Sequence, residues 1–135
     1  EDGDGGYRAM KESLNMAKIS SEKVDYINAH GTSTVKGEEI EINAISRLFK
    51  HNLFVSSTKS SIGHLLGAAG SVESIFSIMS INKNILPATL NLDNPLETNN
   101  INLIPKIPLE KKINYALSNS FGFGGTNTAL LFKSI

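Results

Sequence analysis

Hydrophobic positions recur every three or four residues in two stretches of the chain, a spacing that is typical of amphipathic helices. The first stretch predicts a helix over 6–18, and the second predicts a helix that begins near Gly37. The apolar positions are Met10, Leu14 and Ala17 in the first stretch and Ile42, Ala44, Ile45, Leu48 and Phe49 in the second. In a third stretch, 65–81, apolar residues cover most of the helical circumference, which predicts a buried helix.

Short apolar runs that contain β-branched residues predict the strands. The predicted strands are 24–29, 53–56, 115–120 and 128–132, with a shorter one around 85–90 inside a stretch punctuated by four prolines. A glycine-rich turn joins the last two long strands. Helices that alternate with strands and are followed by a strand pair predict a layered α/β sheet with one buried helix.

Length and composition bound what the chain can do. Its 135 residues are enough for one compact domain, 1–135, with a real core. A formal net charge of zero gives no electrostatic reason to expect nucleic acid or an anionic membrane as partner. No apolar run reaches the length of a membrane-spanning helix, so we expect no membrane insertion. The acidic opening lacks an initiator methionine and is unlike a signal peptide, so we expect the start to be internal to a longer protein.

Two histidines stand in the most distinctive stretches of the sequence. His30 lies in NAHGTST, 28–34, and His64 lies in STKSSIGHLLGAAG, 57–70. Two neutral imidazoles that donate to one carbonyl oxygen stabilise an enolate as its charge develops, provided that both face one cavity. The alternative is that each histidine simply hydrogen-bonds backbone at the end of an element. A metal site is disfavoured because neither HExxH nor a Cys/His cluster is present.

Three further features are open to two interpretations each. Lys59 and Glu41 lie close enough in sequence to orient or bias an imidazole, but each is also an ordinary solvated residue type. FGFGG, 121–125, lacks the Lys-Ser/Thr of a P-loop, so it is either a turn whose amides face a substrate oxygen or a structural hairpin. Ser33 lies beside His30, but no GxSxG elbow supports a hydrolase.

Four stretches together resemble a known family. NAHGTST, STKSSIGHLLGAAGSVESI, PATLNLDNP and NSFGFGGTNTALLF are similar to the C-terminal half of elongating β-ketoacyl-acyl carrier protein synthases, in the thiolase-like superfamily. The resemblance implies a thiolase-like fold with a mixed five-stranded sheet and a buried helix. It also implies decarboxylative Claisen condensation of an acyl thioester with malonyl-acyl carrier protein, in fatty acid elongation.

The resemblance assigns catalytic roles by position. It makes His30 and His64 the two histidines of a Cys-His-His triad, which hold the malonyl thioester oxygen. Lys59 matches the lysine that supports the second histidine, and Glu41 matches an acidic residue paired with that lysine region. Phe123 matches a gating phenylalanine whose backbone N–H helps to bind the acyl thioester oxygen.

The remaining assignments concern substrate and cation. Thr32 and Thr34 match threonines that contact the pantetheine arm, and Phe121 and Gly124 lie in the final glycine-rich substrate-binding motif. The resemblance implies no cofactor beyond a structural Na⁺ or K⁺, because the acyl and malonyl groups travel on the phosphopantetheine of acyl carrier protein. The positions that match the cation site are Asn28, Glu73, Ser118 and Asn119.

The implied partners are acyl carrier protein, a second copy in a homodimer and an N-terminal half that this chain lacks. The implied location is the cytoplasm for a bacterial protein and a plastid-type organelle or mitochondrion for a eukaryotic one. Without the N-terminal half, the chain should expose a face that its partner half normally covers. We therefore expect the isolated chain to be marginally stable or prone to aggregation.

Two departures from the family pattern matter. The family's nucleophile is a cysteine, and this chain has none, so the chain alone should be inactive. Glu38 stands where the family usually has aspartate. A polyketide ketosynthase, a non-catalytic carrier-binding or pantetheine-binding partner subunit, and a decarboxylating partner subunit that never had the cysteine remain alternatives. Thiolase is disfavoured because its second cysteine is missing.

Overall fold

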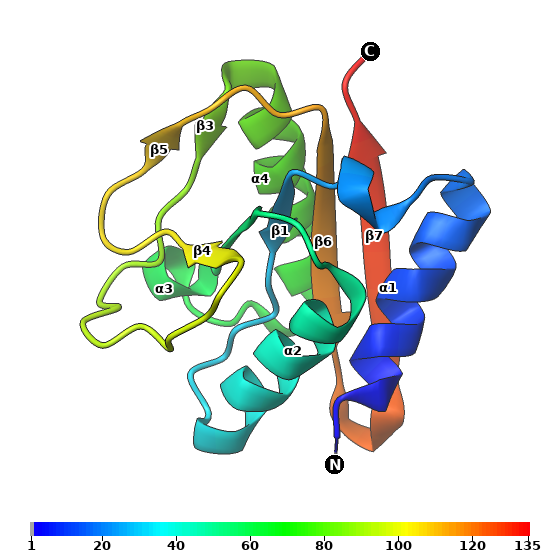
Figure 1. The fold of residues 1–135 in the computed structure, drawn as a ribbon. Helices are drawn as coiled ribbons and strands as arrows, with labels where there is room; N and C mark the ends of the chain where they lie inside the picture. The colour runs from blue at the N-terminus through cyan, green and yellow to red at the C-terminus, as the bar shows by residue number, and fades with distance from the viewer. Residues whose placement is uncertain (1) are drawn as a thin grey trace.

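The computed structural model describes residues 2–135 and has three layers (Figure 1). Helices α1 (Asp4–Ala17) and α2 (Val35–Leu48) cover one face of a five-stranded sheet, and α4 (Ala69–Lys83) covers the other. The sheet has the order β4-β2-β1-β6-β7. Its strands are β1 (Tyr26–Asn28), β2 (Leu53–Ser56), β4 (Ile101–Leu103), β6 (Tyr115–Phe121) and β7 (Asn127–Lys133).

Smaller elements complete the chain. Helix α3 (Lys59–Ile62) follows β2, and β3 (Ile85–Leu86) pairs antiparallel with β5 (Leu109–Glu110). The described part of the chain also forms 3₁₀ turns at Ser21–Lys23, Leu66–Ala68 and Phe123–Gly125.

The centre of the sheet is parallel. Ile27 of β1 lies opposite Val55 of β2 on one side and Leu117 of β6 on the other, and both pairings are parallel. Within the five-stranded sheet of the described residues, only β7 runs antiparallel, and the glycine-rich turn joins it to β6. The carboxyl ends of β2, β1 and β6 therefore meet at one edge of the sheet, and the loops that leave them lie close together.

Alternation along the strands builds a core on each face of the sheet. Ile27 and Leu117 are fully buried and pack with the helices α1 and α2. Their neighbours Tyr26 and Ala116 point to the other face and pack with α4 and the segment after it. The two-residue period of a strand accounts for this division.

Most predicted elements are confirmed. The strand over 53–56 has the predicted bounds, and the two amphipathic helices start two residues earlier than predicted. In the proline-punctuated stretch only Ile85–Leu86 of the predicted strand over 85–90 forms, and β4 and β5 were not predicted. They were missed because they are two or three residues long and carry little periodicity.

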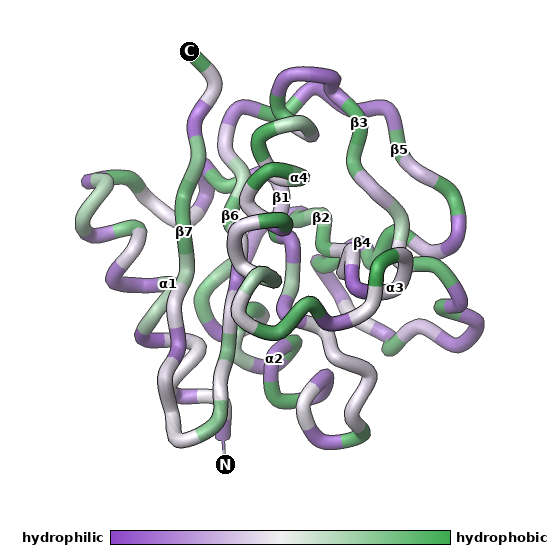
Figure 2. The backbone as a smooth tube through the Cα atoms, turned by 180° about the vertical axis from the view of Figure 1, so that it is seen from behind, coloured by the Kyte–Doolittle hydropathy of each residue, from purple (hydrophilic) through white to green (hydrophobic). Residues whose placement is uncertain are grey.

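The prediction of a buried helix over 65–81 is wrong in two respects. Its first residues form a separate 3₁₀ turn, and α4 then buries a face of small and polar residues against the sheet. That face consists of Ala69, Glu73, Ser77, Ser80 and Ile81. Ile75, Ile78 and Met79 point outward and are 41–55% exposed, and Figure 2 shows hydrophobic positions on this side of α4.

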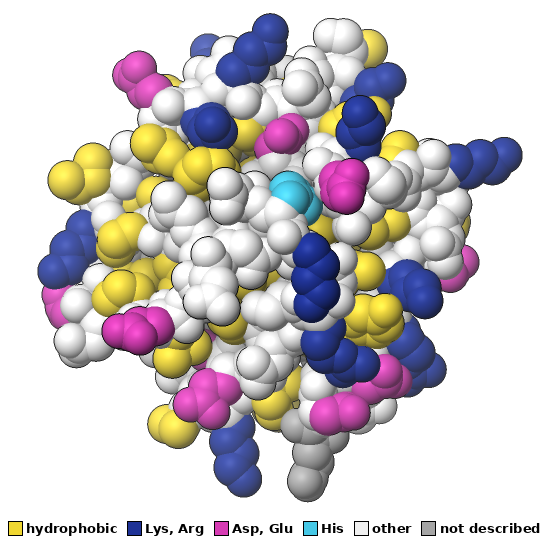
Figure 3. Space-filling view, in the orientation of Figure 1, with side chains coloured by type: hydrophobic (Ala, Val, Ile, Leu, Met, Phe, Trp, Pro, Cys, Tyr) yellow, Lys and Arg dark blue, Asp and Glu magenta, His cyan; other side chains and the backbone are white. Residues whose placement is uncertain are grey.

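The surface agrees with the neutral composition. Basic and acidic side chains are interspersed over the face shown in Figure 3. Among residues 2–135, no helix combines the length and the hydropathy needed to cross a membrane.

Candidate active site

The two histidines converge at the carboxyl edge of the central strands. His30 follows β1, and His64 follows α3, which itself follows β2. Because β1 and β2 are parallel neighbours, the two loops leave the sheet at the same edge, and the ring centroids lie 5.4 Å apart with the ring planes at 85°. Phe121, at the end of β6, has its ring centroid 6.1 Å from that of His30. The convergence that the chemistry requires is therefore present.

A backbone contact determines the tautomer of His64. The N–H of Leu66 donates a hydrogen bond of 3.1 Å to Nδ1 of His64. Since an acceptor nitrogen carries no proton, the neutral ring holds its proton on Nε2. Leu66 takes a left-handed φ of 52° to present this N–H, which is unusual for a residue with a side chain. His64 can therefore donate through Nε2.

His30 is held neutral. Partial burial and, after it, the positive charge of Lys59 and the proximity of His64 together lower the pKa of His30 from its usual 6.5 to about 4. A ring with this pKa is uncharged at neutral pH and has one N–H donor. Both rings can therefore donate to one oxygen without repelling each other as two cations would.

Glu41 fixes the turn that carries His30. Its carboxylate accepts hydrogen bonds of 2.9 Å from the backbone N–H groups of His30 and Gly31, and one of 3.2 Å from Nδ2 of Asn119. Burial raises the pKa of Glu41, and these donors oppose the rise. α2 places this carboxylate over the His30 turn, and the positive charge of Lys59 also lowers its pKa, so the expected pairing of Glu41 with the Lys59 region stays a prediction.

Lys59 pairs with a different acid. Its ammonium group contacts Glu73 of α4, and the two side chains are 4% and 1% exposed. Burial raises the pKa of Glu73, while the adjacent Lys59 lowers it. No hydrogen bond joins Lys59 to His64 within residues 2–135. The positive charge of Lys59 instead acts on His30, whose pKa it lowers.

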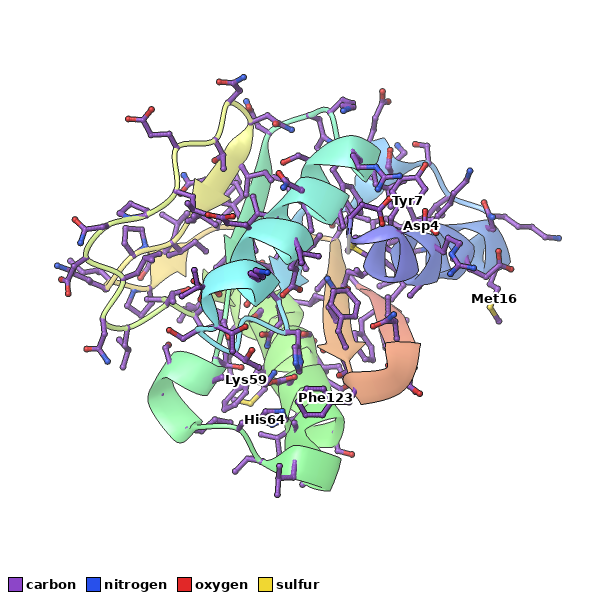
Figure 4. The ribbon with its side chains drawn as sticks, turned by 90° about the horizontal axis from the view of Figure 1, so that it is seen from below. Asp4, Tyr7, Met16, Lys59, His64 and Phe123 are labelled. Carbon is purple, nitrogen blue, oxygen red and sulfur yellow. The ribbon has the colours of Figure 1, made fainter. Side chains whose placement is uncertain are left out.

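An open cleft of about 860 Å³ lies in front of the histidines. The predicted site residues that line it are His30, His64, Thr32, Thr34, Glu41, Phe121 and Phe123. Figure 4 shows His64 and Phe123 in this region, with Lys59 close by. Phe123 is fully exposed at the mouth, and Gly124 does not line the cleft but takes a left-handed φ of 73° that suits glycine.

Three of the four expected cation ligands carry a buried oxygen without a hydrogen-bond partner among the described residues. These oxygens are Glu73 Oε2, Ser118 Oγ and Asn119 Oδ1. The fourth residue, Asn28, has a side-chain oxygen that accepts from the hydroxyl of Thr58. Ser118 and Asn119 are consecutive strand residues, so their side chains point to opposite faces of the sheet, and Asn119 contacts Met10 and Glu41 on the α1 and α2 side. The oxygens of Glu73 and Ser118 suit a hard cation such as an alkali-metal ion on the α4 side, and the side-chain oxygen of Asn119 does not share that position.

Two features of the site were not predicted from the sequence. Leu66 acts through its backbone N–H, and Ser57 acts through a hydroxyl that donates to the carbonyl of Gly31 over 2.9 Å. The hydroxyl-rich run STKSS, directly after a predicted strand, was the available signal for Ser57, because short polar side chains at strand ends often bond local backbone. Nothing in the sequence marked the Leu66 amide.

Comparison with known proteins identifies the family. Residues 1–93 match the family described as "Beta-ketoacyl synthase, C-terminal domain". The chain belongs to this β-ketoacyl synthase family. Two similar proteins are 3-oxoacyl-[acyl-carrier-protein] synthase 2 of Rhizobium meliloti, 53% identical over 98% of this chain, and the mitochondrial 3-oxoacyl-[acyl-carrier-protein] synthase of Arabidopsis thaliana, 45% identical over all of it. The chain spans 32% and 31% of these relatives, about a third of their length.

Solved β-ketoacyl synthases share the fold. A β-ketoacyl synthase from Burkholderia phymatum matches with a TM-score of 0.93 and 36% identity, over 98% of this chain and 33% of that one. A type II polyketide ketosynthase in complex with its acyl-carrier protein matches with a TM-score of 0.90 and 31% identity, over 98% of this chain and 34% of that one. The thiolase-like fold and the family resemblance are thereby confirmed.

Proposed function

We propose that this chain is the malonyl-binding part of a 3-oxoacyl-[acyl-carrier-protein] synthase that extends fatty acids by decarboxylative Claisen condensation. The observation that carries the proposal is the pair of neutral histidines, 5.4 Å apart, at the head of an open cleft. A proton on Nε2 of His64 provides one donor, and the uncharged ring of His30 provides a second.

The chemistry follows from these donors. Cleavage of the bond between the malonyl α-carbon and its carboxylate releases carbon dioxide and leaves an electron pair on the α-carbon. The pair is shared with the thioester oxygen as an enolate, and hydrogen bonds from His30 and His64 stabilise that oxygen most when its charge is greatest. The α-carbon then attacks the acyl thioester carbon, with the acyl group held on a cysteine outside this chain.

The surrounding residues have supporting roles in this proposal. Thr32 and Thr34 contact the pantetheine arm in the cleft, and Phe123 at its mouth opens or closes the acyl side. Phe121 and Gly124 belong to the same acyl-side loop. Lys59, paired with Glu73, keeps a positive charge near the carboxylate that is lost as carbon dioxide. Glu41 holds the His30 turn in place.

We also propose that residues 1–135 are one domain of a longer synthase. The relatives are about three times as long, and this chain has no cysteine of its own, so it should be inactive alone. The proposed partners are acyl carrier protein, which is bound to a structural relative, and a second copy of the full protein. A structural Na⁺ or K⁺ at the positions Asn28, Glu73, Ser118 and Asn119 is the remaining part of the proposal.

Fatty acid elongation is favoured over polyketide synthesis by the degree of identity. The fatty acid relatives are 45% and 53% identical to this chain, whereas the polyketide ketosynthase is 31% identical. A non-catalytic carrier-binding or pantetheine-binding module is disfavoured by the site itself, since such a module has no need of two neutral donors at one cleft.

The test separates the two half-reactions in the full-length protein. His30→Ala and His64→Ala should each lower decarboxylation of malonyl-acyl carrier protein by about 10²–10³-fold, the usual cost of one lost oxyanion donor. Transfer of an acyl group onto the nucleophile should stay within about threefold of the unsubstituted protein, because the histidines act after that step. Loss of acylation with normal decarboxylation would contradict the proposal.

A further inference from the structure

Ser57 joins the two loops that carry the histidines. It lies directly after β2, seven residues before His64, and is 7% exposed. Its hydroxyl donates a hydrogen bond of 2.9 Å to the carbonyl of Gly31, the residue after His30. The His64 loop and the His30 turn are therefore connected by a side-chain contact that belongs to neither histidine.

Both backbone polar groups of Gly31 form hydrogen bonds to side chains. Its N–H donates to Glu41, and its carbonyl accepts from Ser57. A Cβ at Gly31 would lie 2.6 Å from the Cβ of Ser57, and the backbone φ of Gly31 is +36°. A side chain at position 31 would therefore clash with Ser57, and only glycine fits this turn without strain. With both backbone groups occupied, the peptide plane after His30 has little freedom to rotate.

Ser57 is itself anchored from the segment that follows α4. Its N–H donates a hydrogen bond of 3.0 Å to Oγ1 of Thr89. The same segment is attached to α3 by the N–H of Leu90, which donates to the hydroxyl of Ser60 over 2.8 Å. The proline-punctuated segment therefore braces Ser57 through the backbone N–H.

We propose that Ser57, braced by Thr89, is a positioning residue that sets the separation and angle of the two histidine rings. The inference rests on the proposed function, because the rings matter as a pair only if they bind one oxygen. Ser57 touches no substrate in this account, since it does not line the histidine cleft. Its effect is to limit rotation of the His30 turn relative to the His64 loop.

The test uses the full-length protein and compares two buried serines. Ser57→Ala should lower the kcat for malonyl decarboxylation by about 10–100-fold, the usual cost of losing a group that orients a catalytic side chain. KM for malonyl-acyl carrier protein and the rate of acylation should stay within about twofold, because binding and nucleophile are untouched. Ser80→Ala is the matched control, since Ser80 is 2% exposed and also donates a 2.9 Å hydrogen bond to a backbone carbonyl, that of Phe76.

Three outcomes separate the positioning role of Ser57 from the proposed function. If Ser57→Ala and Ser80→Ala decarboxylate at the same rate while His30→Ala lowers decarboxylation by the expected factor of about 10²–10³, the role of Ser57 is overturned and the proposed function stands. If His30→Ala itself decarboxylates normally, the proposed function fails. If Ser57→Ala does not fold, Thr89→Val decides instead: a smaller fall in decarboxylation with normal acylation supports the role, and unchanged decarboxylation overturns it.

Discussion

The two histidines of this site are constrained by different means. His64 is exposed, and its tautomer is set by the N–H of Leu66. His30 is partly buried, its protonation is suppressed, and its backbone is held by Glu41. At the residue scale the site therefore contains two uncharged donors rather than an acid and a base.

The ring of His30 should titrate far below an ordinary histidine. Its pKa is about 4 in the folded protein and near 6.5 when unfolded, so between these values the unfolded state binds more protons. Acidification from pH 6.5 toward 4 should therefore remove stability through this residue. Ring NMR of the full-length protein should give a His30 midpoint near pH 4. Lys59→Met should raise that midpoint, and a midpoint above 6 in the unsubstituted protein would contradict the assignment.

The sequence predicted the identity of these residues better than their contacts. Spacing and resemblance indicated His30, His64 and Lys59 as site residues. The hydrogen bonds of Glu41 to the His30 turn were not predicted, because the reach of Glu41 depends on how α2 crosses the sheet. Tertiary packing of this kind is not encoded in local periodicity.

At the element scale, a buried ion pair attaches α3 to α4. Lys59 at the start of α3 meets Glu73 in α4, and neither side chain is more than 4% exposed. Pairing offsets the desolvation of both charges, but an unpaired charge at this depth is costly. The contact therefore fixes the position of the loop that carries His64.

Glu73→Gln should be strongly destabilising. It leaves the Lys59 ammonium buried without its partner, a change that typically costs about 3–5 kcal/mol of unfolding free energy. The matched control is the exposed pair Lys106–Asp93, whose side chains are 56% and 68% exposed. Asp93→Asn there should cost less than about 1 kcal/mol. Urea denaturation of the full-length variants compares the two, and equal costs would show that burial of the pair is unimportant.

The hydrophobic periodicity gave a wrong prediction for the burial of α4. An apolar stretch that covers most of a helix predicts burial on all sides, yet α4 places serines and Glu73 toward the sheet and Ile75, Ile78 and Met79 outward. Small side chains allow α4 to approach the strands closely. Glu73 points toward the sheet because it forms an ion pair with the buried Lys59. The parallel register of β1, β2 and β6 was likewise invisible in the sequence, although it is what brings the histidines together.

At the scale of the whole molecule, α4 presents an apolar face that the described residues do not cover. Three outward side chains on one helix are more than scattered surface hydrophobics, and such a patch normally packs against another protein surface. The outward side of α4 is therefore the candidate for the face that we expect the isolated chain to expose. The tendency to aggregate stays a prediction.

Substitution of the patch should change the behaviour of the isolated chain. Ile75→Ser, Ile78→Ser and Met79→Ser together should reduce aggregation and binding of a hydrophobic dye, because they remove the apolar contact area. Met16→Ser is the control, since Met16 is 79% exposed on α1, away from the patch. Light scattering after size-exclusion chromatography measures the difference. A monodisperse unsubstituted chain with a cooperative thermal transition would count against this account.

The most direct test of the central claim is a crystal structure of the full-length protein with a non-hydrolysable malonyl-pantetheine analogue. The account predicts that the thioester oxygen lies within hydrogen-bonding distance, about 2.7–3.2 Å, of a ring nitrogen of both His30 and His64. It also predicts that the pantetheine arm passes Thr32 and Thr34. An analogue bound with its thioester oxygen away from both rings would contradict the claim that these histidines form one oxyanion site.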